Sequence, residues 1–205
     1  MENIKKYFTG KALIVLCLIL FVPAVGFSEV KKTYYKTGEL KAETNFKDDK
    51  KEGPCKKYYK SGKLEEVANF KNGKAEGLVK RYYESGVLKK EQRYKNNKKY
   101  GPRKTYYENG KLKHELKYRQ GEKEGLCIWY YENGSLKQKL KYRQGKREGL
   151  CKWYHENGNL KMVGKYKKFK KNGLWKTFYK SGNLKEKTDY KNGKLVGIFK
   201  TDPEN

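Results

Sequence analysis

The sequence has few histidines, few prolines and little aliphatic material. Its 205 residues include two His and four Pro, and hydrophobic residues make up 36% of the chain. Two histidines do not suggest a metal cluster, and so small an apolar fraction excludes the large aliphatic core of a helical bundle or of a doubly wound α/β domain. We therefore expect neither a metal nor a cofactor. Low hydropathy with a net charge of +28 is also typical of disordered chains.

The aromatic and glycine contents argue against disorder. The chain contains 19 Tyr, 8 Phe, 3 Trp and 21 Gly. Aromatic side chains favour strands, and glycine favours tight turns. The composition therefore predicts an all-β protein made of short strands.

The N-terminal segment differs from the rest of the chain. Three lysines precede an almost wholly apolar run over residues 12–25. This pattern predicts a signal peptide helix over residues 1–28, cleaved near Gly26 or Ser28, and export to the periplasm, the outer surface or the medium. The alternative is an uncleaved membrane anchor formed by residues 12–28.

A pair of aromatic residues recurs every 24 residues. The first member of each pair falls at Tyr34, Tyr58, Tyr82, Tyr106, Tyr130, Tyr154 and Phe178. Glycine, leucine and a further aromatic residue follow at fixed offsets, without insertion or deletion, so the repeat is not a product of chance. The chain divides into the signal peptide (1–28), a lead-in (29–33), seven repeats (34–201) and a tail (202–205).

Each repeat predicts two antiparallel strands, about fourteen in all. Ser-Gly or Asn-Gly follows the aromatic pair, as at Asn109-Gly110, and predicts a two-residue turn with positive φ. The second turn falls at dipeptides such as Asn72-Gly73, and Lys168-Phe169 breaks this turn chemistry in the sixth repeat.

The alternation of side chains predicts two different faces. Pairing across the first turn places Tyr131 opposite Leu136, Trp129 opposite Gln138 and Cys127 opposite Leu140. The same face collects an apolar run at Cys55, Val79, Cys127, Cys151, Trp175 and Phe199, whereas the opposite face carries a row of lysines. We expect a single-layer antiparallel meander that curls over its apolar face, because no other segment is left to cover it.

The repeats resemble a known family. Units such as Gly173-Leu-Trp-Lys-Thr-Phe-Tyr-Lys-Ser-Gly-Asn-Leu-Lys, followed by Tyr190-Lys-Asn-Gly-Lys, are similar to the bacterial MORN-repeat variant, a stack of β-hairpins with a period near 24. The resemblance implies a binding scaffold. Related repeats are associated with membrane and phosphoinositide attachment, and some bacterial members are labelled antitoxins of toxin–antitoxin pairs.

No residues form a recognisable catalytic group. Similar repeats precede the catalytic domain of some phosphatidylinositol-phosphate kinases, but this chain has no Gly-rich nucleotide loop and no catalytic Asp/Asn loop, so we expect no enzyme. His114 and His155 occupy repeat positions without partners. Cys55, Cys127 and Cys151 share one repeat position, about 9.6 Å apart in adjacent units, which exceeds the span of a disulfide. We expect core cysteines and no disulfide.

Two faces are therefore the candidate binding sites. The basic face comprises Lys56, Lys80, Lys104, Lys152 and Lys176 with Tyr58, Tyr82, Tyr106, Tyr130 and Tyr154; the aromatic face comprises Tyr59, Tyr83, Tyr107, Trp129, Tyr131 and Trp153. Lysine-rich faces attract polyanions such as lipid headgroups, lipopolysaccharide or acidic glycans. Alternatively, the lysines only solubilise the sheet and protect its edges, and the aromatic side chains only pack on the repeat leucines.

We expect an exported, monomeric scaffold that binds a protein or an anionic surface at the bacterial envelope. Export argues against nucleic acid as a partner. The first alternative is an antitoxin-like or immunity protein that binds and occludes a specific partner. Because Trp129-Tyr-Tyr-Glu-Asn-Gly is similar to the aromatic repeats of choline-binding or cell-wall-binding modules, such a module is the second alternative.

Overall fold

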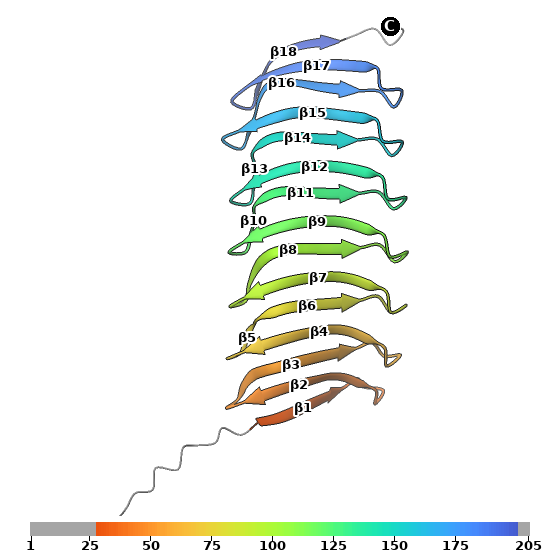
Figure 1. Cartoon of the computed structure of the whole chain (residues 1–205), viewed down its shortest axis with the longest axis vertical. Helices are drawn as coiled ribbons and strands as arrows, with labels where there is room; N and C mark the ends of the chain where they lie inside the picture. Colours follow the sequence, from red (N-terminus) through yellow and green to blue (C-terminus); the bar gives the residue numbers. More distant parts are fainter. Residues whose placement is uncertain (1–27, 201–205) are drawn as a thin grey trace, which may run out of the picture.

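The structure, a computed structural model, describes residues 28–200. In this range the chain forms one antiparallel sheet of eighteen strands, in which each hairpin lies beside the next (Figure 1). The predicted all-β meander of tandem hairpins is confirmed. Residues 1–27 of the predicted signal peptide and the predicted tail lie outside the described residues. None of the described residues belongs to a helix long and apolar enough to span a membrane.

The strands follow one another in chain order. They are β1 (Ser28–Tyr34), β2 (Leu40–Lys47), β3 (Lys50–Tyr58), β4 (Leu64–Lys71), β5 (Lys74–Ala75), β6 (Gly77–Tyr82), β7 (Leu88–Lys95), β8 (Lys98–Tyr106), β9 (Leu112–Arg119), β10 (Glu122–Lys123), β11 (Gly125–Tyr130), β12 (Leu136–Arg143), β13 (Lys146–Arg147), β14 (Gly149–Tyr154), β15 (Leu160–Lys167), β16 (Lys170–Phe178), β17 (Leu184–Lys191) and β18 (Lys194–Lys200). The two-residue strands β5, β10 and β13 each continue, after one glutamate, into the next strand.

The first turn of each repeat has three residues, not the predicted two. In the fifth repeat Tyr131 N donates to Ser135 O at 2.8 Å, and Gly134 N donates to Tyr131 O at 2.9 Å. Only the glycine has positive φ, at 95°, which is typical of a type I turn followed by a left-handed glycine. The longer turn introduces a bulge between Trp129 and Tyr130. Leu136 therefore pairs with Tyr130, and the prediction that it pairs with Tyr131 is wrong.

The second turn of each repeat is the predicted two-residue turn. Both Asn72 and Gly73 have positive φ, at 49° and 74°, as a type I′ turn requires. Lys168 and Phe169 adopt the same conformation, at 49° and 67°, although neither is a glycine. The left-handed conformation costs such residues roughly 1–2 kcal/mol each, so the rest of the sixth repeat imposes this turn against local preference.

The buried side chains form a row along the middle of one face. We call the face with Cys127 and Leu140 the inner face, and the face with Leu126 and Ile128 the outer face. Cys127 pairs with Leu140, and Trp129 with Gln138, as predicted. The central row of the inner face consists of Thr44, Cys55, Ala68, Val79, Gln92, Arg103, Leu116, Cys127, Leu140, Cys151, Gly164 and Trp175.

The sheet is neither closed nor strongly curled, which corrects our expectation that it curls over its apolar face. Among residues 28–200, β1 pairs with β2 and β18 with β17, so both remain edge strands. The central row is nonetheless buried, with 0% exposure at Cys127 and 1% at Leu140. Trp129, Trp153 and Tyr166 pack against it. In this part of the array the aromatic side chains of the repeats themselves cover the row, without closure of the sheet.

Phe199 departs from the predicted apolar run. It is 61% exposed in the edge strand β18. Lys187 lies opposite Phe199, whereas the equivalent Val163 of the preceding repeat lies opposite Lys176. This difference is a shift of one residue, which moves a side chain to the other face of a sheet. The prediction that Phe199 belongs to the apolar face is therefore wrong.

Candidate binding surfaces

In the first six repeats the second residue of the aromatic pair forms a ladder of hydrogen bonds from one repeat to the next, on the side of the sheet where the first turns lie. The hydroxyl of Tyr107 donates to the carbonyl oxygen of Tyr130 at 2.9 Å. The same bond recurs at Tyr35, Tyr59, Tyr83 and Tyr131. His155 replaces this tyrosine, and its Nε2 lies 3.0 Å from the carbonyl oxygen of Phe178. Because a carbonyl only accepts, the His155 tautomer that carries a proton on Nε2 preserves the ladder.

Lysines lie over the rings of these tyrosines. The Nζ atoms of Lys89, Lys113 and Lys137 are 4.9, 5.0 and 5.0 Å from the ring centroids of the tyrosines in the same repeats. Such contacts contribute about 0.5–1 kcal/mol at exposed sites. Sequence reasoning assigned four of these tyrosines to the aromatic face. In the structure they link adjacent repeats through their hydroxyl groups: Tyr59, Tyr83, Tyr107 and Tyr131. Trp129 and Trp153 pack against the central row, and Trp153 lines one groove together with Tyr131.

Carboxylates accompany the lysines in the N-terminal half of the outer face. Lys56 lies directly opposite Glu43, and Lys104 lies directly opposite both Glu91 and Glu115. The hydroxyls of two predicted binding tyrosines also donate to these carboxylates, Tyr58 to Glu43 and Tyr106 to Glu91. Burial, together with the bond to Glu91, raises the pKa of Tyr106 to about 12. This half of the basic face is therefore largely compensated.

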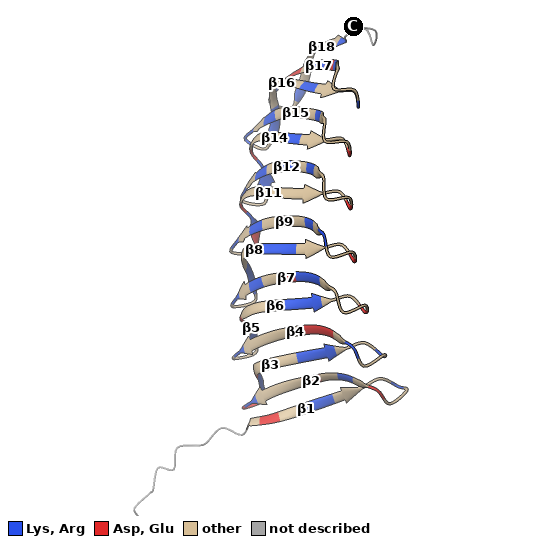
Figure 2. Cartoon of the chain, turned by 45° about the vertical axis from the view of Figure 1, so that its right-hand side comes forward, with Lys and Arg blue, Asp and Glu red and all other residues tan. Residues whose placement is uncertain are grey.

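The C-terminal half of the outer face lacks this compensation. Lys139 lies directly opposite Lys152, and Lys176 lies directly opposite Lys187. Like charges placed directly opposite each other destabilise a sheet. Among residues 28–200, the ion pair on the outer face joins Lys32 to Glu43, in the N-terminal half. Lysine and arginine recur on strands along the whole array, whereas β4 carries a clear acidic band (Figure 2).

Exposed leucines run along the same part of the outer face. Leu126, Leu150 and Leu174 occupy one repeat position and are 43%, 53% and 46% exposed. Each of the first two lies directly opposite a lysine, Lys141 or Lys165, whereas Leu174 lies directly opposite Asp189. The C-terminal half of the outer face thus combines a row of exposed aliphatic side chains with uncompensated lysines.

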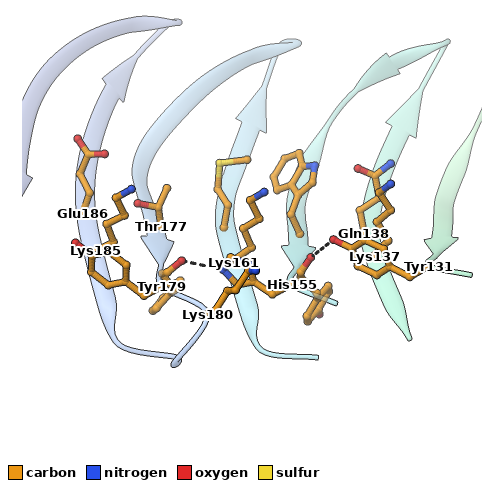
Figure 3. Close-up of a pocket in the computed structure, with 14 residues that line it drawn as sticks. Tyr131, Lys137, Gln138, His155, Lys161, Thr177, Tyr179, Lys180, Lys185 and Glu186 are labelled. Carbon is orange, nitrogen blue, oxygen red and sulfur yellow. Dashed lines mark hydrogen bonds between the residues drawn. The ribbon is translucent and has the colours of Figure 1, made fainter. Parts of the chain in front are cut away.

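A groove on the inner face crosses the last three hairpins (Figure 3). Its volume is about 580 Å³, and its lining includes Trp153, Met162 and Thr177 together with Lys137 and Lys161. Lys161 occupies the repeat position of Lys137, but His155 replaces the tyrosine over which it would lie. Tyr131 and Trp153, predicted as binding residues of the aromatic face, both line this groove, but sequence reasoning missed the groove itself. The substitution of His155 for tyrosine was the available signal.

The described residues offer surfaces for binding and no reactive centre. Within residues 28–200 no group of three or more His, Cys, Asp or Glu side chains is arranged to hold a metal ion. Cys55, Cys127 and Cys151 are buried and unbridged. Burial raises the pKa of the Cys127 and Cys151 thiols, which keeps them protonated and unreactive.

Comparison with known families agrees with the repeat architecture. The MORN repeat variant matches residues 30–48, 51–72, 75–96, 99–120, 123–144, 147–168 and 171–192. No curated protein matches the chain. The seven matched segments cover well over half of the sequence, and the chain therefore belongs to the MORN repeat variant family.

Proposed function

We propose that this protein is an exported, non-enzymatic scaffold of the bacterial envelope that attaches to an anionic surface through the C-terminal half of its outer face. The observation that carries the proposal is the pairing of Lys139 with Lys152 and of Lys176 with Lys187. Such pairs destabilise the free protein. A bound anionic surface offsets that repulsion. The paired lysines therefore destabilise the free protein but stabilise its complex with the surface.

The exposed leucines select the kind of surface. Equivalent residues of adjacent repeats recur about every 9.6 Å, so Leu126, Leu150 and Leu174 form a row, with a lysine directly opposite each of the first two. Polybasic segments gain about 1 kcal/mol per Lys near an anionic membrane, and aliphatic side chains gain further by leaving water. Anionic lipid headgroups above an apolar layer match this pattern, and so does lipopolysaccharide.

The test compares two matched double variants. Lys152→Gln with Lys176→Gln removes one lysine from each like-charge pair, whereas Lys56→Gln with Lys80→Gln removes lysines that face Glu43 and Glu91. Binding to phosphatidylglycerol vesicles should weaken about 30-fold in the first variant, from about 1 kcal/mol per lysine, and less than threefold in the second. Equal losses in both variants, or equal binding to neutral phosphatidylcholine vesicles, would contradict the proposal.

The groove on the inner face supports a second candidate function, the occlusion of a partner protein as in antitoxin-like proteins. Its aromatic and thioether surface at Trp153 and Met162 lies beside Lys137, Lys161 and Lys180, which matches an acidic, partly apolar peptide segment. One partner that remains bound at high salt, and that Met162→Glu releases while Lys152→Gln does not, would favour this function over surface attachment.

A further inference from the structure

The central row of the inner face changes character in the middle of the array. Gln92 occupies the repeat position of Leu140, which lies two repeats later. Arg103 occupies the repeat position of Cys127, which lies one repeat later. Lys90, Thr105 and His114 lie next to them on the same face. We call these five residues the polar cluster. Gln92 and Arg103 interrupt a row that is apolar from Cys55 to Val79 and from Leu116 to Trp175, with side chains that need hydrogen-bonding partners.

Strand pairing brings the polar cluster together across β7, β8 and β9. Lys90 lies directly opposite Thr105, and Thr105 directly opposite His114. Gln92 lies directly opposite Arg103. Side chains in such positions have Cβ atoms about 5 Å apart on one face, so the five side chains surround one spot on the inner face.

The polar atoms of this cluster lack partners. Arg103 Nε, Thr105 Oγ1, His114 Nε2 and Gln92 Oε1 are buried and have no hydrogen bond. Gln92 is 1% exposed, and its Nε2 is already bound to the carbonyls of Arg93 and Tyr100. Buried polar atoms are normally hydrogen-bonded, so four unpaired ones at one spot call for a physical explanation, such as a bound water or ion.

The charge at this spot is positive. Lys90 lies directly opposite Arg81 as well as Thr105, and Arg103 is close enough to disfavour protonation of Lys90. The nearby carboxylate of Glu66 is already paired with Lys57 and Arg81. Burial, with the charges of Arg81 and Arg103, lowers the pKa of Lys90 to about 8. Burial likewise lowers the pKa of His114 to about 4, so that this ring is neutral and adds no charge.

We propose that the polar cluster binds a phosphate group, either inorganic phosphate or a phosphate monoester. Arg103 and Lys90 supply cationic donors for its oxygens, and Thr105 supplies a hydroxyl. A phosphate that retains a proton also carries an O–H, which donates to Gln92 Oε1. Sulfate lacks this donor at neutral pH. The site lies on the opposite face from the uncompensated lysines and does not depend on the proposed attachment to a surface.

The test restores the apolar row. Lys90→Gln, Gln92→Leu and Arg103→Val introduce residues that the chain itself carries at the equivalent positions, at Gln138, Leu140 and Val79. Inorganic phosphate and glycerol 3-phosphate are each titrated at constant ionic strength while thermal unfolding is followed. At about ten times Kd, phosphate should raise the unfolding midpoint of the unmodified chain by about 3 °C. The triple variant should unfold at a higher temperature and not respond.

Two further measurements complete the test. Trp129 lies beside His114, with ring centroids 6.4 Å apart, so its fluorescence should report binding in the unmodified chain and in the single variant Lys90→Gln, which should bind more weakly. The Lys152→Gln, Lys176→Gln variant should keep the full response. Stabilisation by inorganic phosphate alone identifies the free ion, and stabilisation by the ester as well identifies a phosphorylated molecule. No response to either, or an equal response of the triple variant, would overturn the proposal.

Discussion

Gly164 lies directly beneath the indole ring of Trp175 in the central row. A Cβ atom at Gly164 would overlap three carbon atoms of that ring. The indole is 1% exposed and lies against Trp153, Tyr166 and Tyr190, with ring centroids 5.7, 5.1 and 6.2 Å away. It therefore has no space into which to move. We expect Gly164→Ala to lower the free energy of unfolding by about 3 kcal/mol, the upper end for overpacking.

Urea unfolding of a double-mutant cycle isolates the cause. Trp175→Cys should cost about 3–5 kcal/mol alone, but in its presence Gly164→Ala should cost nothing, because the ring is gone. Gly164 does not adopt a positive φ, so alanine itself is compatible with the strand. Additive effects, within about 0.5 kcal/mol, would show that the ring is not what excludes a side chain at Gly164.

Three other predictions follow from single residues. Tyr107→Phe should cost about 1 kcal/mol in urea unfolding because it removes one step of the ladder, while Tyr34→Phe, at an exposed tyrosine outside it, should cost nothing. Lys90→Gln should raise the free energy of unfolding below pH 8, with the gain vanishing between pH 8 and the ordinary lysine pKa of 10.5; a pH-independent gain would contradict this. Stability should fall from pH 6.5 toward pH 4 as His114 protonates in the unfolded chain, and His114→Gln should flatten that fall.

The sequence was sufficient to predict the repeat, the hairpins and the two faces. A 24-residue period with glycine at fixed positions leaves little freedom in strand order, and Asn72-Gly73 specifies its turn because both residues tolerate positive φ. The first turn was misassigned because Ser-Gly and Asn-Gly also fit a three-residue turn with only the glycine left-handed. The two-residue and the three-residue turn differ in whether a bulge forms between Trp129 and Tyr130, and that depends on the pairing of the whole hairpin.

The partners of individual side chains could not be predicted. Periodicity placed Tyr107 on the aromatic face but did not show that its hydroxyl reaches the next repeat, since that contact depends on the stacking of hairpins. The available clue was that His155, which replaces the tyrosine at this repeat position, can also donate a hydrogen bond. Sequence reasoning did not single out Gln92 or Arg103, and only the packed structure shows that they lie in the central row with polar atoms that lack partners.

The most direct test of surface attachment places a probe on the exposed row. An environment-sensitive fluorophore is attached at Leu150→Cys or, as the control, at Pro54→Cys, the same repeat position in the compensated half. The native Cys127 and Cys151, at 0% exposure, should not react. With phosphatidylglycerol vesicles we predict a blue shift for the probe at residue 150 and none at residue 54. No shift at residue 150, or equal shifts at both, would contradict attachment through the C-terminal half of the outer face.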